Sequence, residues 1–136
     1  MSLEDHKRVV RRFNDEVIVK GDRASFDALM APDFVNHSAP PNVPNGAESM
    51  WHTFQNILRP ALSDLRVTIL DQVAEEDKVT SRKRISGMHT GSLMGVPASN
   101  RMVTIEVIDI VRVVDGRYAE HWGINTLPSV LAQLRG

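Results

Sequence analysis

A carboxylate and an imidazole lie on two neighbouring apolar segments near the end of the sequence. Asp109 belongs to the run 108–114 and His121 to the run 117–122, with Asp115-Gly116 between them. Two apolar runs joined at Asp-Gly predict a β-hairpin. An aspartate that faces a histidine in an apolar pocket can share one proton with it and can move a proton on a carbon next to a carbonyl. The sequence therefore indicates an acid–base pair, provided that both side chains share a face.

The register of the hairpin decides whether they do. We expect a three-residue loop from Val114 to Gly116, a type I turn whose glycine forms a bulge. Asp109 then lies directly opposite His121, on a face shared with Val107, Val111, Ala119 and Gly123. A two-residue type I′ turn would instead place Trp122 opposite Asp109. A third alternative is that Asp109 or His121 only anchors a loop or faces water.

Composition limits the classes of function. The chain has 136 residues, a formal net charge of -1 and no cysteine. We expect one domain over residues 1–136, with no disulfide, no cysteine chemistry and no electrostatic reason for a nucleic-acid partner. The chain has no apolar run of membrane-spanning length and no signal peptide at its start, so the expected location is the cytoplasm, with no membrane partner.

Helical periodicity comes first along the chain and strand periodicity follows. Helices are expected over 3–20, from Asp22 to about residue 30, over 47–58 and over 127–134, with Pro60 ending the third. Strands are expected at 34–37, 65–70, 79–89 and in the hairpin, with a polar turn at 75–78. This order predicts an α+β fold, in which a strongly curved, mainly antiparallel sheet wraps the N-terminal helices as a conical barrel around an apolar cavity.

Further polar and aromatic side chains could line such a cavity. The candidates for substrate binding are Asn36, His37, Trp51, Phe54, His89, Val107 and Trp122. The run Arg82-Lys83-Arg84 is interpreted as a solvated strand face. The histidines have no metal-ligand spacing, no Gly-x-Ser-x-Gly motif is present, and the glycines near residue 91 lack the lysine of a phosphate loop, so we expect no metal and no cofactor.

The order of these segments resembles the SnoaL-like polyketide cyclases, within the nuclear-transport-factor-like α+β barrel superfamily. Four stretches carry the resemblance: residues 13–22, 31–37, 87–97 and 108–123. The resemblance implies a conical barrel, a homodimer or higher oligomer, and a cofactor-free intramolecular aldol cyclisation of a polyketide ester through an enolate. In alignment, the acid/base aspartate of the cyclases falls on Gly123, their cavity-facing histidine on Asp109 and a further polar position on Val107.

Three functions therefore stay open. The first is enolisation and ring closure of a hydrophobic polyketide-type carbonyl compound, with Asp109 as base and His121 as its partner. The second is cofactor-independent hydroxylation of an aromatic polyketide, because some relatives in such pathways are implicated in it. The third is a small-molecule-binding module without catalysis. Ile108 and Ile110, on the opposite face from Asp109, indicate a homodimer contact.

Overall fold

The computed structural model describes all residues, 1–136. Helix α1 (Leu3–Arg12) continues into the π-helical segment η1 (Phe13–Val19), and α2 (Arg23–Leu29) follows. The other helices are α3 (Ala47–His52), which continues into the π-helical η2 (Thr53–Leu58) and α4 (Arg59–Ala61), and the C-terminal α5 (Leu127–Arg135). The strands are β1 (Met30–Asn36), β2 (Leu62–Glu75), β3 (Lys78–His89), β4 (Met102–Val114) and β5 (Arg117–Asn125). None of the helices has both the length and the apolar character needed to cross a membrane.

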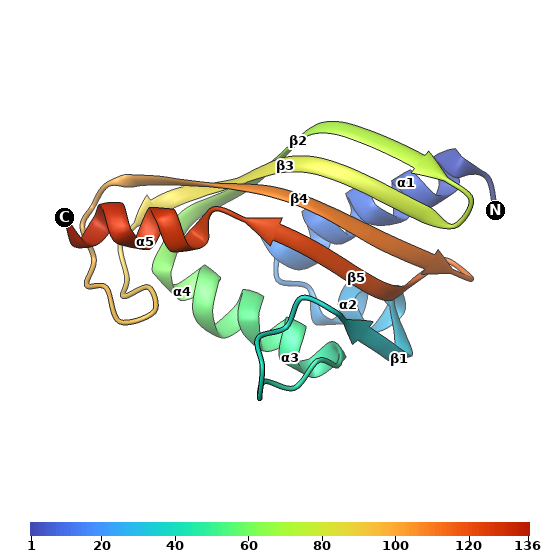
Figure 1. Cartoon of the computed structure of the whole chain (residues 1–136), viewed down its shortest axis with the longest axis horizontal. Coiled ribbons are helices and arrows are strands. Elements are labelled where there is room, and N and C mark those ends of the chain that lie inside the picture. Colours follow the sequence, from blue (N-terminus) through green and yellow to red (C-terminus); the bar gives the residue numbers. More distant parts are fainter.

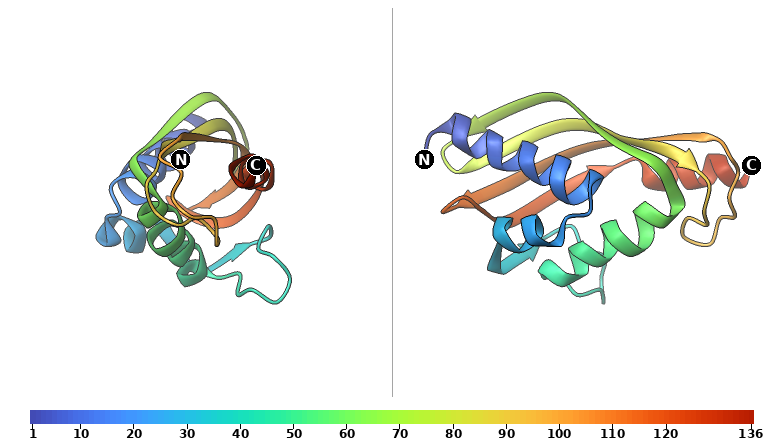
Figure 2. Two further views of the ribbon diagram at one scale, coloured as in Figure 1. Left: turned by 90° about the vertical axis from the view of Figure 1, so that its left-hand side faces the viewer. Right: turned by 180° about the vertical axis from the view of Figure 1, so that it is seen from behind.

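The strands form one sheet in the order β1-β5-β4-β3-β2. All neighbouring strands are antiparallel except β1 and β5, which are parallel. Figure 1 shows the long strands running together over the helices, and Figure 2 shows the sheet bending around α1, α2 and the α3–α4 helix. The predicted α+β class, with N-terminal helices on a curved and mainly antiparallel sheet, is confirmed.

Local signals set most helix ends. Gly21 has φ +68°, a left-handed conformation that glycine adopts freely, and it ends the first helix as expected. The carboxylate of Asp22 accepts hydrogen bonds from the N–H groups of Ala24 and Ser25 and so caps α2. The expected end of the third helix at residue 58 is three residues too early, since the chain stays helical through Pro60 to Ala61. Pro60 lies in the first turn of the short helix α4, where the missing N–H of proline is tolerated.

The hairpin register differs from both sequence-based alternatives. Asp115 and Gly116 have φ of +50° and +75°, the left-handed pair of a two-residue type I′ turn, so the expected three-residue loop is wrong. An irregularity then follows: Val113 pairs with Tyr118 but Arg112 pairs with Glu120, which leaves Ala119 as a one-residue bulge. The bulge shifts the register by one, so that neither His121 nor Trp122 but Gly123 lies directly opposite Asp109.

Asp109 and His121 nevertheless share the inner face of the sheet. Gly123 is opposite Asp109, and His121 is two residues from Gly123 on the same strand, where side chains repeat their direction. Two clusters of buried apolar side chains pack between this face and the helices. The first includes Val79 of β3 and Val111 of β4, and the second includes Ile85 and Ile105 of the same two strands. Position 83 of β3 and position 109 of β4 therefore lie between the two clusters.

Candidate active site

His121 and Asp109 meet as diagonal neighbours across β5 and β4. The distance from His121 Nε2 to Asp109 Oδ2 is 3.3 Å. A diagonal pair starts about 7–8 Å apart at its backbone, and a long side chain can close that gap when nothing stands between. Gly123 leaves this space free, because a Cβ there would lie 3.0 Å from Cε1 and 3.2 Å from Nε2 of His121. The absent side chain at position 123 thus lets the imidazole lie over the backbone and reach Asp109.

The other nitrogen of His121 is held by β1 and the loop after it. Its Nδ1 lies 2.9 Å from Asn36 Oδ1. The N–H of Ser38 donates to the same oxygen at 3.1 Å, which identifies it as the acceptor end of the Asn36 amide. Nδ1 must therefore carry a hydrogen, so a neutral His121 would turn a lone pair toward Asp109. Nε2 and Oδ2 can form a hydrogen bond only when a second proton, in addition to the one on Nδ1, lies between these two atoms.

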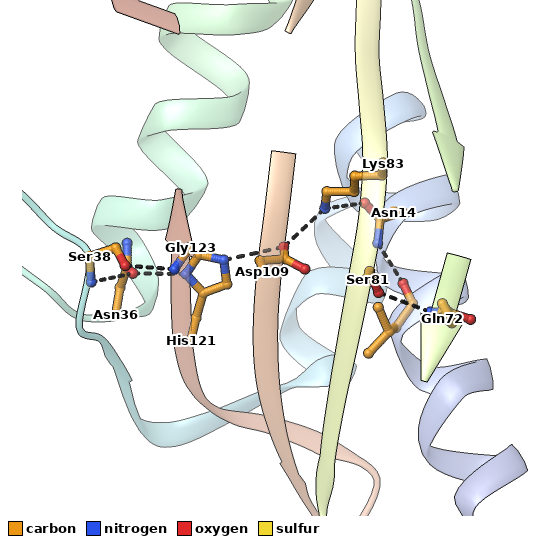
Figure 3. Close-up of polar contacts among 10 residues, drawn as sticks. Asn14, Asn36, Ser38, Gln72, Ser81, Lys83, Asp109, His121 and Gly123 are labelled. Atoms are coloured by element: carbon orange, nitrogen blue, oxygen red, sulfur yellow. Dashed lines mark hydrogen bonds and ion pairs between the residues drawn. The ribbon is translucent and has the colours of Figure 1, made fainter. Parts of the chain in front are cut away.

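Lys83 completes the cluster from β3. Its Nζ lies 3.2 Å from Asp109 Oδ2 and donates to Asn14 Oδ1 at 2.6 Å, while Asn14 Nδ2 donates to the carbonyl of Val10 at 2.8 Å. Figure 3 shows these side chains as a row from Asn36 to Asn14, drawn from β1, β5, β4, β3 and the first helix. The interpretation of residues 82–84 as a solvated face is wrong for Lys83, which is 4% exposed.

The sequence does contain a signal for Lys83 and Asn14. Lys83 has the same strand parity as Val79 and Ile85, which places it on the inner face, but the flanking Arg82 and Arg84 conceal that parity. Asn14 follows Val10 by four residues, at the spacing that keeps both on the same face of a helix. The polarity of these two residues alone indicates exposed side chains, whereas the periodicity of their helix and strand places them in the interior.

Asp109 is 5% exposed, so its negative charge is balanced by neighbouring side chains and not by water. Burial alone raises the pKa of Asp109, but the charge of Lys83 and the hydrogen bond from His121 together bring this pKa below its ordinary value. Its second oxygen, Oδ1, is buried without a hydrogen-bond partner. Burial and the charge of Asp109 also raise the pKa of Tyr118 well above its usual range, which keeps that phenol neutral. Asp109 is therefore held as a carboxylate.

Three of the other predicted site residues, His37, His89 and Trp122, lie away from Asp109. His89 is fully buried and bonds Ser99 through Nδ1, six residues along β3 from Lys83, or about 20 Å at the usual strand rise. Trp122 points to the outer face of the sheet, where its ring stacks on His37 at 4.8 Å. The structure thus does not bring His37, His89 or Trp122 to Asp109.

Trp51 and Phe54 lie on the helices that the sheet wraps. Trp51 packs on Phe26, and Phe54 packs on Phe13 and is in contact with both apolar clusters. The inner-face side chains of Leu65, Val67 and Val107 are likewise only partly buried. Two hollows in the surface lie elsewhere, one around Thr80 and Ile110 and one around Ile108 and Ile124, and neither is lined by Asp109 or His121.

The space over Gly123 yields a first prediction. Gly123→Ala should push the His121 ring away from Asp109, because the new methyl group would lie closer to the ring than ordinary van der Waals contact allows. A structure of the variant, or the loss of NMR cross-peaks between the two side chains, measures the displacement. Gly46→Ala is the matched control, since a Cβ at that position meets nothing within 4 Å. An unmoved ring in Gly123→Ala would contradict the packing argument.

The buried charges yield a second prediction, measured by urea unfolding. Asp109→Leu should lower the free energy of unfolding by about 3–5 kcal/mol, because it leaves the Lys83 ammonium buried without its counter-charge. The double variant Asp109→Leu/Lys83→Met should recover most of that loss. Asp71→Asn, which breaks the exposed ion pair with Arg82, is the control and should cost less than about 1 kcal/mol. Additive effects of the two inner substitutions would show that the pair is not coupled.

Comparison with known proteins assigns the chain to a family over nearly its full length. The family model described as SnoaL-like polyketide cyclase matches residues 8–134. The structure of TsrD from Streptomyces laurentii is 28% identical with a TM-score of 0.85, over 98% of this chain and 97% of that chain. IdmH from Streptomyces antibioticus, titled a putative polyketide cyclase, is 29% identical with a TM-score of 0.82, over 96% and 99% of the two chains.

A third similar structure carries a different description. AclR from Streptomyces galilaeus, titled a putative hydroxylase, is 25% identical with a TM-score of 0.85, over 98% of this chain and 83% of that one. No curated protein sequence matches the chain. The family model spans nearly the full length, and structures of similar length share the fold. The chain belongs to the SnoaL-like polyketide cyclase family.

Proposed function

We propose that this protein is a cofactor-free acid–base enzyme that enolises a hydrophobic, polyketide-type carbonyl compound and promotes intramolecular aldol ring closure. The observation that carries the proposal is the oriented imidazole of His121, held between Asn36 Oδ1 at 2.9 Å and Asp109 Oδ2 at 3.3 Å. An imidazole with one nitrogen fixed and the other beside a buried carboxylate is suited to take and return one proton.

His121 is the group of the pair that we assign to contact with substrate. Its side chain is 18% exposed against 6% for Asp109, and the lowered pKa of Asp109 makes that carboxylate a weak proton acceptor. In this scheme the α-proton of the substrate moves to His121 Nε2 as the C–H bond breaks, and its electron pair forms the enolate. The enolate carbon then attacks a second carbonyl group of the same molecule, and the imidazolium returns the proton to the alkoxide that forms as the π bond of this carbonyl breaks. Asp109, given the role of base from sequence, becomes the counter-charge of that imidazolium.

The proposed substrate position lies between the two apolar clusters. Phe54, Leu65, Val67 and Val107 are partly exposed although they face the interior, which is expected of side chains that line space for an apolar ligand. Val107 is two residues from Asp109 on the same face of β4. A substrate over these side chains would meet the imidazole at its exposed edge.

Hydroxylation of an aromatic polyketide is the second candidate. The similarity to AclR favours it, and so does Gly123, which lies where the resemblance to the cyclases implies their acid/base aspartate. The two candidates differ in what they consume, because ring closure needs no oxidant, whereas hydroxylation needs oxygen and a reduced aromatic substrate. Product formation that stops under argon would favour hydroxylation.

Proton exchange at carbon tests the first candidate without the natural substrate. Wild-type protein in D₂O should catalyse deuterium incorporation next to the carbonyl of bicyclic or polycyclic ketones and esters, followed by mass spectrometry. His121→Gln and Asp109→Asn should each lower the exchange rate by roughly 10²–10⁴-fold, the usual contribution of a general acid–base group.

The control is His52→Gln, because that histidine is exposed and bonds only Asn56. Exchange that survives in both His121→Gln and Asp109→Asn would exclude the pair from the chemistry. Ligand binding that stays unchanged in these variants, with no turnover by the wild type, would instead favour a binding module.

Self-association through the outer face of the sheet is a further part of the proposal. Val73, Ile108 and Ile124 are 64%, 46% and 72% exposed, and the ladder places Ile108 beside Ile124 and Ile110 beside Trp122. Exposed apolar side chains that gather on one face of a sheet mark a contact site. Light scattering should report a homodimer for the wild type and a monomer for Ile108→Glu/Ile124→Glu. Val43→Glu, in the exposed loop before α3, should stay dimeric, and a monomeric wild type would contradict this part of the proposal.

A further inference from the structure

Lys83 carries a buried ammonium group whose polar neighbours are themselves held in place by hydrogen bonds. The side chain is 5% exposed, and its two polar neighbours are Asp109 Oδ2 at 3.2 Å and Asn14 Oδ1 at 2.6 Å. Asn14 is itself 2% exposed and cannot turn over, because its Nδ2 donates to the helical carbonyl of Val10. Burying a charge costs free energy, so an ammonium fixed by an oriented amide calls for an explanation beyond packing.

The hydrogen-bond donors around one oxygen, Asp109 Oδ2, determine where a proton on the pair can lie. Asp109 Oδ2 faces Lys83 on one side and His121 Nε2 on the other. Lys83 can only donate, and the hydrogen bond to Asn36 already assigns one hydrogen to His121 Nδ1. A proton placed on Oδ2 would point at a donor whichever way it turned, whereas the same proton on Nε2 has the carboxylate as its acceptor.

We propose that Lys83, oriented by Asn14, is a positioning residue that keeps Asp109 as the carboxylate, so that a proton taken up by the pair is held on His121 Nε2. The catalytic role of Lys83 rests on the proposed acid–base function. The location of the proton on the pair does not depend on that function. Lys83 acts through Asp109 and does not contact substrate. The titratable groups that face Asp109 are Lys83 from β3 and His121 and Tyr118 from β5, and Asn14 is the neutral contact from the first helix.

The first test reads the protonation of Asp109 directly by the NMR shift of its Cγ, assigned through Asp109→Asn. In the wild type, lowering the pH should protonate His121 Nε2 while the Cγ of Asp109 keeps its carboxylate shift. In Lys83→Met the titration of Asp109 should move up by about 1–3 pH units, because the cation that lowered its pKa is gone. Lys83→Arg should restore the wild-type behaviour. Lys78→Met, on the exposed end of the same strand, should not change it.

The second test uses the deuterium exchange assay. The low-pH limb of the rate should move upward in Lys83→Met, because the pair is easier to protonate without the neighbouring positive charge, and should not move in Lys83→Arg or Lys78→Met. A role in packing alone would lower the rate at every pH and leave the limb in place, which would overturn the proposal. Protonation of Asp109 before His121 in the wild type would overturn it too, even where Lys83→Met does not fold. If Asp109 titrates as described but no exchange is found, the proposed function fails and the positioning role stands.

Discussion

The ion pair between Lys83 and Asp109 is the constraint on which the interior of this protein depends. Both charges lie out of water, between two apolar clusters that share the same two strands. Neither charge could be buried alone without a large cost in free energy, so the two strands must bring them together. Asn14 accepts a hydrogen bond from Lys83 on one side and His121 meets Asp109 Oδ2 on the other, while Asp109 Oδ1 has no partner. Five elements of the fold contribute to this single row of polar side chains, as Figure 3 shows.

Two irregular features of the backbone make the contact with His121 possible. The bulge at Ala119 shifts β5 by one residue, and without it the type I′ turn would place His121 on the outer face of the sheet. Gly123 then leaves open the space over which the imidazole extends. The pair is therefore diagonal, with a glycine directly opposite the aspartate. A histidine can span this distance where a shorter side chain could not.

The same geometry relates the site to its family. The resemblance to the cyclases places their acid/base carboxylate at position 123, and here the ring of His121 occupies the space that a side chain at 123 would need. In this chain a glycine at position 123 accompanies a histidine two residues earlier and an aspartate on the next strand. In the proposed function the proton-transfer group lies in the same region of the fold but is carried by His121.

How much of this could be predicted from sequence depends on the range of the interaction involved. The helices, their glycine and aspartate boundaries and the strands follow from local periodicity and turn chemistry, which act over a few residues. The type I′ turn was one of two turns that the sequence allows, but the bulge at Ala119 has no local signature, because the pairing with β4 decides it. The neighbouring Arg82 and Arg84 indicate that Lys83 is exposed to solvent. Only the contacts of Lys83 with Asp109 and Asn14 show that it is buried. The sequence by itself determined the elements; the tertiary structure decided that Asp109 and His121 share a face and which partners they have, because the strand register and the charge balance of a buried group are set by residues far away in the chain.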